Sequence, residues 1–441
     1  MMGEAYPSYR DSCLPWAPKL PEHWEVLRNG RLFAHRVQTG FPDLPILEVS
    51  LRTGVRVRDM ENLKRKQVMS QKEKYKRAAK GDIAYNMMRM WQGAVGPAPV
   101  DGLVSPAYVV VKPYPEVNSS YFSYLFRTAA YMQEVNKFSR GIVADRNRLY
   151  WESFKQMPSL VPSRPEQDQI VAYLRAQDAQ IARFIKAKRD LIGLLTEQKL
   201  RIIDQAVTRG LDATVKLRPS GNEWLGDVPE HWRVERLKWV CRFIYGDSLS
   251  DANRRHGDIP VYGSNGQVGL HDESNAVGPC IVIGRKGSFG KINYSERDLF
   301  AIDTTFYVDR KSSDADIRWL YYLLVWCRLD RISKDSAVPG LDRTDAYNTL
   351  VPVCDVPEQR RIAAQLDNDT AEVDAAIARV EEEIKLIREY RDRLIADVVT
   401  GQVDVRGWVP GPDDIVTDED KVALDESEDN PEVEEEVGED T

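Results

Sequence analysis

The sequence lacks the residue patterns that mark disulfide frameworks, metal sites and membrane spans. Its five cysteines and five histidines are scattered along 441 residues, and no two cysteines form a CxxC pair. An odd, dispersed set of thiols argues against both disulfides and zinc and favours a reducing compartment. No apolar run approaches the length of a transmembrane helix, and the opening residues, MMGEAYPSYRDS, do not resemble a signal peptide. We therefore expect a cytoplasmic protein without a metal ion or cofactor of its own.

Catalytic motifs are also missing. The segment 284–291, GRKGSFGK, has the glycine content of a phosphate-binding loop, but Arg285 stands at its first glycine position and Ile292 at its Ser/Thr position. We find no GxSxG, no HExxH and no Asn/Asp-Pro-Pro-aromatic tetrapeptide of the kind that amino-methyltransferases use. His23 and His231 each precede a tryptophan in a PEHW segment, where a structural role is the better interpretation. We therefore expect no catalytic residue, and a glycine-rich turn that lets the backbone approach a phosphodiester.

Negative charge is concentrated at one end of the chain. Residues 409–441 contain 15 Asp or Glu and one Lys, whereas residues 1–408 contain 60 basic and 54 acidic side chains. The overall net charge of −8 therefore hides a mildly basic main part. A segment this acidic and this poor in apolar residues cannot bury a core, so we expect residues 409–441 to form a disordered acidic tail.

One long helical pattern occurs twice. Residues Pro165 to Thr208 and Pro357 to Thr400 align without a gap at an offset of 192, and each begins with Pro-Glu-Gln, which suits the first turn of a helix. Apolar residues recur at steps of three and four, as along the contact line of a coiled coil. We predict that the two helices pack against each other in antiparallel orientation. The predicted seam is Ile170, Leu174, Ile181, Ile185, Ile192 and Leu195 with Ile362, Leu366, Val373, Ile377, Ile384 and Ile387.

A second repeat encloses the first. SCLPWAPKLPEHW, from Ser12 to Trp24, aligns with SGNEWLGDVPEHW, from Ser220 to Trp232, at an offset of 208. The chain is therefore a tandem duplication of a PEHW block, a globular segment and a long helix. We predict an N-terminal block (1–24), a first globular domain (25–162), the first long helix with a central block (163–227), a second globular domain (228–352), the second long helix (353–408) and the acidic tail (409–441).

The two globular segments show a strand-rich α+β pattern. PILEVSL, GDIAYNM and SPAYVVVK in the first, and IPVYGSNGQVG, PCIVIGRKGSFGKINY and AIDTTFYVD in the second, have the composition of strands and turns. Residues 121–138 and 316–332 are each expected to form one helix. Because strands, helix and a closing Leu-Val-Pro follow in the same order, we predict one fold with different loops.

Basic and amide side chains cluster on the predicted turns. Residues 51–90 contain 12 Lys or Arg against four Asp or Glu, and such clusters supply the sequence-independent part of nucleic-acid affinity. Base edges are read mainly by Arg, Lys, Asn and Gln. The candidate DNA-binding residues are Lys80, Asn86, Arg89, Gln92, Arg140, Arg146 and Asn147 in the first segment, and Tyr262, Ser264, Asn265, Gln267, Arg285, Lys286, Ser288, Lys291 and Arg343 in the second.

SGNEWLGDVPEHW, the tandem inserts and the two helices headed by PEQxxI together resemble the specificity subunit of type I restriction–modification systems, over nearly all of residues 6–408. Cys13 and Ala17-Pro18 depart from the second copy, so we expect the N-terminal block to pack less regularly. The resemblance implies that each insert reads one half of a split double-stranded DNA site and that the coiled coil sets their spacing.

The resemblance also implies partners. Two modification subunits would methylate adenine with S-adenosylmethionine, and two restriction subunits, where present, would add ATP- and Mg-dependent cleavage. Two other classes stay open from the residues alone. The chain could be a fused methyltransferase or nuclease, which binding of S-adenosylmethionine would indicate. It could instead be a protein-binding coiled-coil scaffold, which salt-insensitive or absent DNA binding would indicate.

Overall fold

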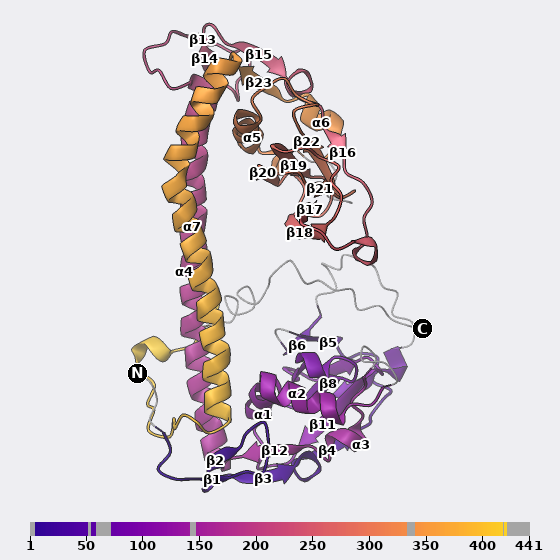
Figure 1. The fold of residues 1–441 in the computed structure, drawn as a ribbon. Helices are drawn as coiled ribbons and strands as arrows, with labels where there is room; N and C mark the ends of the chain where they lie inside the picture. The colour runs from indigo at the N-terminus through magenta and orange to yellow at the C-terminus, as the bar shows by residue number, and fades with distance from the viewer. Residues whose placement is uncertain are drawn as a thin grey trace. The chain divides into compact units, whose positions relative to one another are not determined.

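The computed structural model describes residues 5–51, 54–58, 72–141, 147–332, 340–417 and 419–420. They fall into two compact units, one made of residues 1–189 with 381–441 and the other of residues 190–380 (Figure 1). Each unit contains one strand-rich domain and part of both long helices, which gives an α+β fold of two such domains joined by the helices. Within the described residues, no helix is both long enough and apolar enough to cross a membrane.

In its described residues the first unit contains eleven short strands before its helices. They are β1 (Tyr9–Asp11), β2 (Lys19–Pro21), β3 (Glu25–Arg28), β4 (Phe33–Arg36), β5 (Leu47–Ser50), β6 (Gly54–Val57), β7 (Lys76–Ala78), β8 (Ile83–Asn86), β9 (Val95–Pro97), β10 (Gly102–Val104) and β11 (Tyr108–Pro113). After them come α1 (Ser119–Phe126), α2 (Ala129–Phe138), α3 (Trp151–Phe154), β12 (Pro158–Val161) and α4 (Arg164–Arg209), of which the part beyond residue 189 belongs to the second unit.

The second unit repeats this order. Its strands are β13 (Leu217–Pro219), β14 (Asp227–Pro229), β15 (Arg233–Arg236), β16 (Ile244–Tyr245), β17 (Ile259–Gly263), β18 (Gly266–His271), β19 (Cys280–Gly284), β20 (Ile292–Ser295), β21 (Phe300–Ala301) and β22 (Thr305–Val308). They are followed by α5 (Ile317–Trp326), α6 (Arg343–Tyr347), β23 (Leu350–Val353) and α7 (Val356–Val399), whose last part lies in the first unit. Short 3₁₀ turns occur in both units.

The central sheets of the two domains have the same topology. One is an antiparallel sheet in the order β4-β11-β8-β9, and the other is an antiparallel sheet in the order β16-β22-β19-β20. In each domain a closing pair, β3 with β12 or β15 with β23, joins the start of the domain to the strand just before the long helix. The prediction of one shared fold with different loops therefore agrees with the strand order.

The apolar core of each unit lies between the central sheet, the domain helix and the long helices. In the first unit Trp24, Phe122 and Leu174 belong to one buried cluster, and in the second Trp232 and Leu366 belong to another. Because each cluster includes residues of the long helices, burying the domain core also fixes that domain on its helix.

The expected single helix over residues 121–138 is two helices. Thr128 interrupts the pattern and caps α2, since its hydroxyl accepts a hydrogen bond from the Tyr131 amide. Thr is a preferred N-cap residue. Because the apolar periodicity continues on both sides of Thr128, the sequence pattern predicted one helix instead of two. In the second domain the helical pattern 316–332 likewise ends early, with α5 stopping at Trp326 and a short 3₁₀ turn following it.

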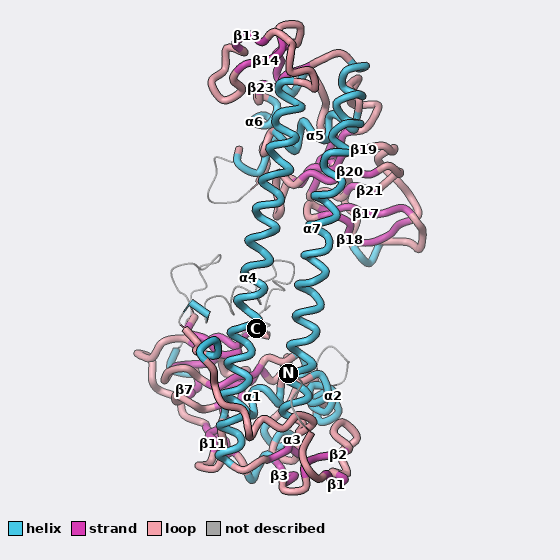
Figure 2. Tube along the Cα trace, turned by 90° about the vertical axis from the view of Figure 1, so that its left-hand side faces the viewer, coloured by secondary structure: helices cyan, strands magenta, loops and turns pink. Residues whose placement is uncertain are grey.

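The long helices α4 and α7 run antiparallel, as predicted (Figure 2). In the first unit Asp178 pairs with Arg391 and Lys188 pairs with Glu383. A later residue of α4 thus faces an earlier residue of α7, as in an antiparallel pair. In the second unit Lys199 pairs with Asp374. Gly210, which ends α4 with a φ of 75°, lies close to the first turn of α7, in agreement with that direction.

The N-terminal block does not pack less regularly than its copy, contrary to the expectation. Tyr9 pairs with Pro21 in β1–β2, and Leu217 pairs with Pro229 in β13–β14, which is the same register at the offset of 208. Cys13 takes a φ of 62° where its counterpart Gly221 takes 80°. The block therefore keeps the glycine conformation although a non-glycine residue at positive φ costs about 1 kcal/mol or more.

Candidate nucleic-acid interface

Two loops of the second domain meet beyond the end of its central sheet. The Lys291 ammonium donates hydrogen bonds to the side-chain oxygen of Asn265 at 2.6 Å and to its carbonyl oxygen at 2.7 Å. Gly287, at a φ of 74°, approaches so closely that a β-carbon there would lie 3.3 Å from the Ser264 hydroxyl. The turn after β17 and the loop after β19 therefore present Ser264, Asn265 and Lys291 together, as neighbouring donors and acceptors.

A pair of arginines flanks a half-exposed tyrosine at the same loop. The guanidinium carbons of Arg343 and Arg285 lie 4.9 and 5.3 Å from the centre of the Tyr245 ring. The Leu341 amide donates to the Arg285 carbonyl at 2.9 Å, which holds the two arginine-bearing segments together. Tyr245 is 47% exposed. A tyrosine between cations can bind a phosphate or stack with a base, because guanidinium groups suit phosphate geometry and aromatic rings suit bases.

The remaining candidates of the second domain lie on these two loops or on the strands next to them. Lys286, Ser288 and Gln267 are exposed, whereas Tyr262 is half-buried on β17 and packs against a small apolar cluster. Gln267 donates weakly to the Gly269 carbonyl at 3.5 Å. The side chains of Lys286, Ser288 and Gln267 are therefore accessible to a ligand without any rearrangement.

In the first domain the candidate turn follows β8, which occupies the place of β19. Arg89 and Gln92 are half-buried on this turn, and Gly93 beside them packs close to Met132 of α2. Asn86 is only 4% exposed, and its side-chain oxygen accepts the Met88 amide at 2.9 Å. The burial of Asn86 favours a structural role in holding the turn.

A second segment of the first domain lies against this turn. The Leu149 amide donates to the Met87 carbonyl at 2.8 Å, which brings Asn147 and the exposed Arg140 and Arg148 to the same end of the sheet. Asn147 donates to the Asn136 side chain at 2.9 Å. Arg146 and the basic run at 63–67 lie outside the described residues.

Lys80 is exposed on the turn between β7 and β8. Its backbone amide donates to Asp101 at 2.8 Å, and this bond, with that of Arg77, lowers the pKa of the Asp101 carboxyl. The Lys80 ammonium itself extends from an exposed residue, so its charge is available to a polyanion.

The predicted seam residues of the long helices are all withdrawn from solvent to some degree. Ile170, Leu174, Ile181, Ile185, Ile362, Leu366, Val373 and Ile384 are buried, and Ile192, Leu195, Ile377 and Ile387 are half-buried. By contrast, Phe184, Leu194 and Tyr390 are more than half exposed. The predicted seam residues therefore differ in exposure from other large apolar residues of the same helices.

Sequence reasoning missed what the PEHW and PEQ motifs do. Glu166, the glutamate of the first PEQ, is 5% exposed and accepts hydrogen bonds from Tyr6 at 2.8 Å, from the Trp24 indole at 3.0 Å and from the His23 ring at 2.9 Å. Burial beside this carboxylate raises the pKa of the Tyr6 phenol far above its usual value. The histidine and tryptophan of PEHW are therefore structural partners of the helix-heading glutamate.

The same contact recurs in the second unit. Glu358 accepts hydrogen bonds from the His231 ring and from the Trp232 indole, each at 3.1 Å. In both copies an arginine lies eleven residues before the proline of Pro-Glu-His-Trp and donates to the carbonyl of its tryptophan: Arg10 to Trp24 at 2.6 Å and Arg218 to Trp232 at 2.7 Å. The spacing shared by the two copies could have revealed these arginines.

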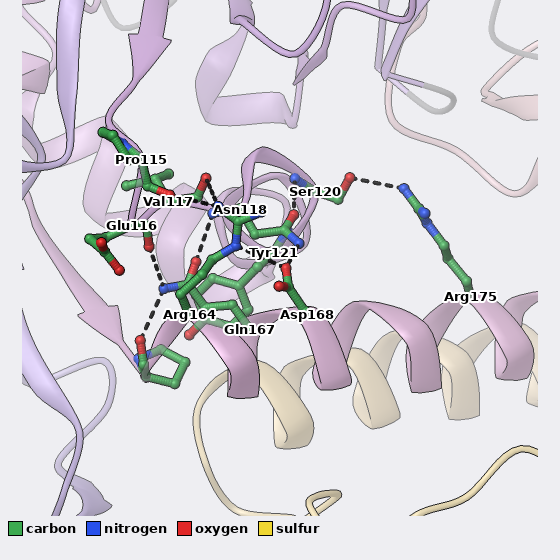
Figure 3. Close-up of polar contacts among 11 residues, drawn as sticks. Pro115, Glu116, Val117, Asn118, Ser120, Tyr121, Arg164, Gln167, Asp168 and Arg175 are labelled. Carbon is green, nitrogen blue, oxygen red and sulfur yellow. Dashed lines mark hydrogen bonds and ion pairs between the residues drawn. The ribbon is translucent and has the colours of Figure 1, made fainter.

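The glutamine of PEQ fastens the domain helix to the long helix. The Gln167 side-chain oxygen accepts the Asn118 amide at 2.8 Å, and its nitrogen donates to the Pro162 carbonyl at 3.0 Å (Figure 3). Gln359 repeats both bonds with the Asp316 amide at 2.8 Å and the Cys354 carbonyl at 2.9 Å. These glutamines therefore fix each domain helix to the start of its long helix.

No group of three or more His, Cys, Asp or Glu suited to a metal ion occurs among the described residues. The arrangement offers cations, amides and hydroxyls on loops at the end of a rigid sheet. Such groups bind phosphates and base edges, and the geometry described here assembles none of them into a nucleophile–base pair.

Comparison with known proteins found one family model and solved structures that are similar to this chain. Residues 229–386 match the model of the family described as the type I restriction modification DNA specificity domain. No curated protein sequence matches the chain. A chain from a solved structure described as the "structural basis underlying complex assembly and conformational transition of the type I R-M system" shares 16% identity at a TM-score of 0.54, over 87% of this chain and 99% of that one.

Two further solved structures were found at lower structural similarity. The HsdS subunit from Thermoanaerobacter tengcongensis has 16% identity and a TM-score of 0.39, over 87% of this chain and 98% of that one. The specificity subunit from M. genitalium has 14% identity and a TM-score of 0.36, over 86% of this chain and 96% of that one. The likeness of fold rests on the first structure and the sequence match on the second repeat. The specificity-domain match is therefore to residues 229–386, and the likeness of fold extends over 87% of this chain, which includes the same frame repeated before the matched residues.

Proposed function

We propose that the chain is the DNA-reading subunit of a type I complex and that each strand-rich domain reads one half of a split double-stranded target. The observation that supports this most directly is the matched position of the loops after β8 and β19. Both follow the same strand of the same four-stranded sheet, and both carry basic and amide side chains. Specific contacts to base edges would come from these loops, and contacts to phosphate from the exposed cations around them.

The two long helices would set the spacing between the half-sites. Helix α4 has 46 residues and α7 has 44. At about 1.5 Å per residue each is roughly 65–70 Å long, which is about two turns of B-DNA. A paired, continuous helix resists bending, so the number of its residues would translate into the number of unread base pairs.

The chain itself would be non-catalytic and would act in a prokaryotic cytoplasm. Adenine methylation with S-adenosylmethionine would come from two modification subunits, and ATP- and Mg-dependent cleavage from two restriction subunits where these are present. The paired helices α4 and α7 would carry these partners, and DNA would bind to the loops after β8 and β19. The competing proposals are a fused enzyme, which binding of S-adenosylmethionine by the chain alone would indicate, and a protein-binding scaffold, which salt-insensitive or absent DNA binding would indicate.

The first test exchanges one domain. Replacing residues 25–161 with the corresponding segment of a specificity subunit of different target should change one half-site and leave the other and the spacer unchanged. The measurement is the position of methylated adenines in DNA from cells that carry the chimaera and its modification partner. A change in both half-sites would refute independent reading.

The second test shortens the coil by one heptad. The antiparallel pairing means that facing segments are not those matched by the offset of 192, so the cut is placed between the ion pairs Lys188–Glu383 and Lys199–Asp374. Deleting residues 190–196 with 376–382 removes about 10 Å from both helices, which corresponds to about three base pairs. We expect a spacer shorter by about that amount with both half-sites unchanged. The same methylation map with an unaltered spacer would contradict the proposal.

A further inference from the structure

The first unit contains a cleft of about 680 Å³ where its domain helices meet the two long helices. The lining comes from α1 and the start of α2, from Arg175 and Asp178 of α4, and from residues of α7 between 391 and 396. Small-ligand sites in proteins have volumes of roughly 300–1,000 Å³. The cleft therefore has room for a small molecule, whereas a DNA duplex, whose major groove alone is about 12 Å wide, cannot enter it.

The carboxylate of Asp178 is already paired within the lining. The Tyr124 phenol donates to one of its oxygens at 2.7 Å, and the Arg391 guanidinium donates to the other at 2.6 Å. The Asp178 side chain is 6% exposed. Because both oxygens are engaged and the charge is compensated by Arg391, Asp178 adds little repulsion toward a bound anion.

Two exposed arginines supply positive charge to the cleft. Arg175 donates to the Ser120 hydroxyl at 3.0 Å (Figure 3). The Arg393 side chain is 83% exposed and lies 3.7 Å from the Asp397 carboxylate. A guanidinium has five N–H donors, so the bond to Ser120 leaves Arg175 with donors for a second acceptor. Guanidinium groups bind phosphate oxygens in pairs, which makes these two side chains suited to a phosphate group.

The start of α2 adds further positive charge. Arg127 is half-buried and directly precedes Thr128, the N-cap residue of α2. Arg127, Thr128, Ala129 and Ala130 all line the cleft. The first amides of a helix have no acceptor within it, and the helix dipole places partial positive charge at this end. The cleft therefore combines arginine side chains with a helix N-terminus, which is a common arrangement for binding an anion.

Asp392 is the group that opposes an anion in this cleft. Although the residue is exposed, desolvation of its carboxyl raises the pKa of Asp392. The charge of Asp178 acts in the same direction, and those of Arg391 and Arg127 act against it. With four arginines against two aspartates, the lining carries a net charge of +2 even when both carboxyls are ionised.

Apolar side chains complete the lining. Pro97, Met132 and Ile395 belong to it, and such walls suit an aromatic base better than an inorganic anion, which would leave them uncovered. The second unit differs at the matching place, because Asp367 stands there at the offset of 192 from Arg175. We therefore expect one such site in the chain.

We propose that this cleft binds a nucleoside phosphate, with Arg127, Arg175 and Arg393 holding its phosphate groups and the apolar wall covering its base. Because the lining comes from the domain helices and from both long helices, the bound molecule links the first domain to the helix pair. It stabilises that junction by an amount set by its concentration and affinity. The site is separate from the loops after β8 and β19, so its failure would leave the proposed function untouched.

The test measures binding of ADP to the full-length chain by isothermal titration calorimetry. We expect one ADP per chain with a dissociation constant below about 1 mM. Adenosine should bind at least about tenfold more weakly because it lacks the phosphates. Pyrophosphate should also bind at least about tenfold more weakly, because it leaves the apolar wall uncovered.

Three outcomes of these titrations would overturn the proposal. The first is the absence of ADP binding at about 1 mM. The second is equal affinity for adenosine and ADP, which would remove the role of the arginines. The third is displacement of ADP by a random-sequence duplex of about 30 base pairs, which would assign the same arginines to the DNA backbone.

Four variants separate the cleft from general electrostatic attraction. Arg175→Gln and Arg393→Gln should each weaken ADP binding about tenfold, because each removes a charge-assisted pair of hydrogen bonds. Asp392→Asn should strengthen it about threefold by removing a repulsive charge, a gain that misfolding cannot produce. Arg201→Gln, which changes an exposed arginine of α4 outside the cleft, is the control and should leave the affinity unchanged. Equal affinities of the three cleft variants and the control would contradict the assignment.

Discussion

The two recognition domains are fixed to the long helices by the same three chemical groups, but the arginine comes from a different helix in each. In the first unit the Tyr124 phenol donates to Asp178 at 2.7 Å, and Arg391 of α7 donates to the same carboxylate at 2.6 Å. Burial beside this carboxylate raises the pKa of Tyr124 well above its usual value. Domain, α4 and α7 thus meet at one buried carboxylate.

The second unit assembles the group differently. Tyr322, which matches Tyr124 in its distance from the helix cap, donates to Asp367 of α7 at 2.7 Å. The cation is Arg318, which belongs to the domain helix itself and donates to Asp367 at 2.7 Å. Arg318 also stacks against tyrosine rings, the nearest being that of Tyr294 at 4.4 Å. Here one domain helix supplies both donors to one long helix.

The two junctions use the same chemical groups, but the arginine comes from α7 in the first and from α5 in the second. A carboxylate at a packed junction requires a cation and hydrogen-bond donors, and any element within reach can supply them. The consequence is unequal burial: the Asp178 side chain is 6% exposed and that of Asp367 is 42% exposed. The first junction should therefore depend far more on its carboxylate than the second.

The largest expected effect comes from removing the buried carboxylate. Asp178→Ala should lower the free energy of unfolding of the first unit by about 3–5 kcal/mol, because it leaves a buried phenol and a guanidinium without their acceptor. Asp367→Ala should cost only about 1 kcal/mol, since solvent replaces much of that contact. Urea unfolding curves of the two variants measure both values. Equal losses of unfolding free energy in the two variants would show that burial does not set the contribution of these carboxylates.

A smaller effect is expected from giving the Arg175–Ser120 contact the charges of its counterpart, Asp367 with Arg318. Arg175 of α4 donates to the Ser120 hydroxyl at 3.0 Å, at the place where the second unit pairs Asp367 with Arg318. Arg175→Asp alone should cost about 1 kcal/mol, because it loses this bond and adds a charge near Asp178.

Adding Ser120→Arg to that variant should recover about half of the loss by rebuilding the polarity of the second unit. The readout is a double-mutant cycle in urea unfolding, with Ser120→Arg alone as the control. Additive single effects would mean that these positions are not equivalent in the two repeats.

The smallest effect concerns the turns that follow the long helices. Asp404 accepts hydrogen bonds from Arg406, and these lower the pKa of its carboxyl below the usual value. A depressed folded-state pKa adds stability above the unfolded-state pKa of about 3.9, and this is lost as the pH falls through the folded value. Asp404→Asn should therefore cost about 0.5–1 kcal/mol at pH 7 and almost nothing near pH 2.

The matched position in the other repeat is the control. Asp212 also has a lowered pKa, but through bonds to Thr214 rather than to a cation, and it is fully exposed. Asp212→Asn should follow the same pH dependence with a smaller amplitude. A loss for Asp404→Asn that persists at low pH would show that the carboxylate–arginine bond is not its cause.

The long helices and the doubled order could be predicted because their signals are local and periodic. Apolar residues at steps of three and four, with Pro-Glu at each start, specify a helix and its buried stripe wherever the chain goes. The break at Thr128 escaped because the same periodicity continues on both sides of one capping residue. For the candidate DNA-binding loops, residue type indicated the candidates, but the burial of Asn86 depends on how its turn packs.

The sequence by itself determined the two long helices, their repeated frame and the charge imbalance of the tail, because spacing and composition act through the nearest turns of the chain. Only the tertiary structure decided which carboxylate each PEHW segment holds and that Arg391 and Arg318 serve matching junctions. It also decided that Asp420 pairs with Arg183 of α4. Partners such as Trp24 and Glu166 are 142 residues apart, and their meeting is set by how whole elements pack.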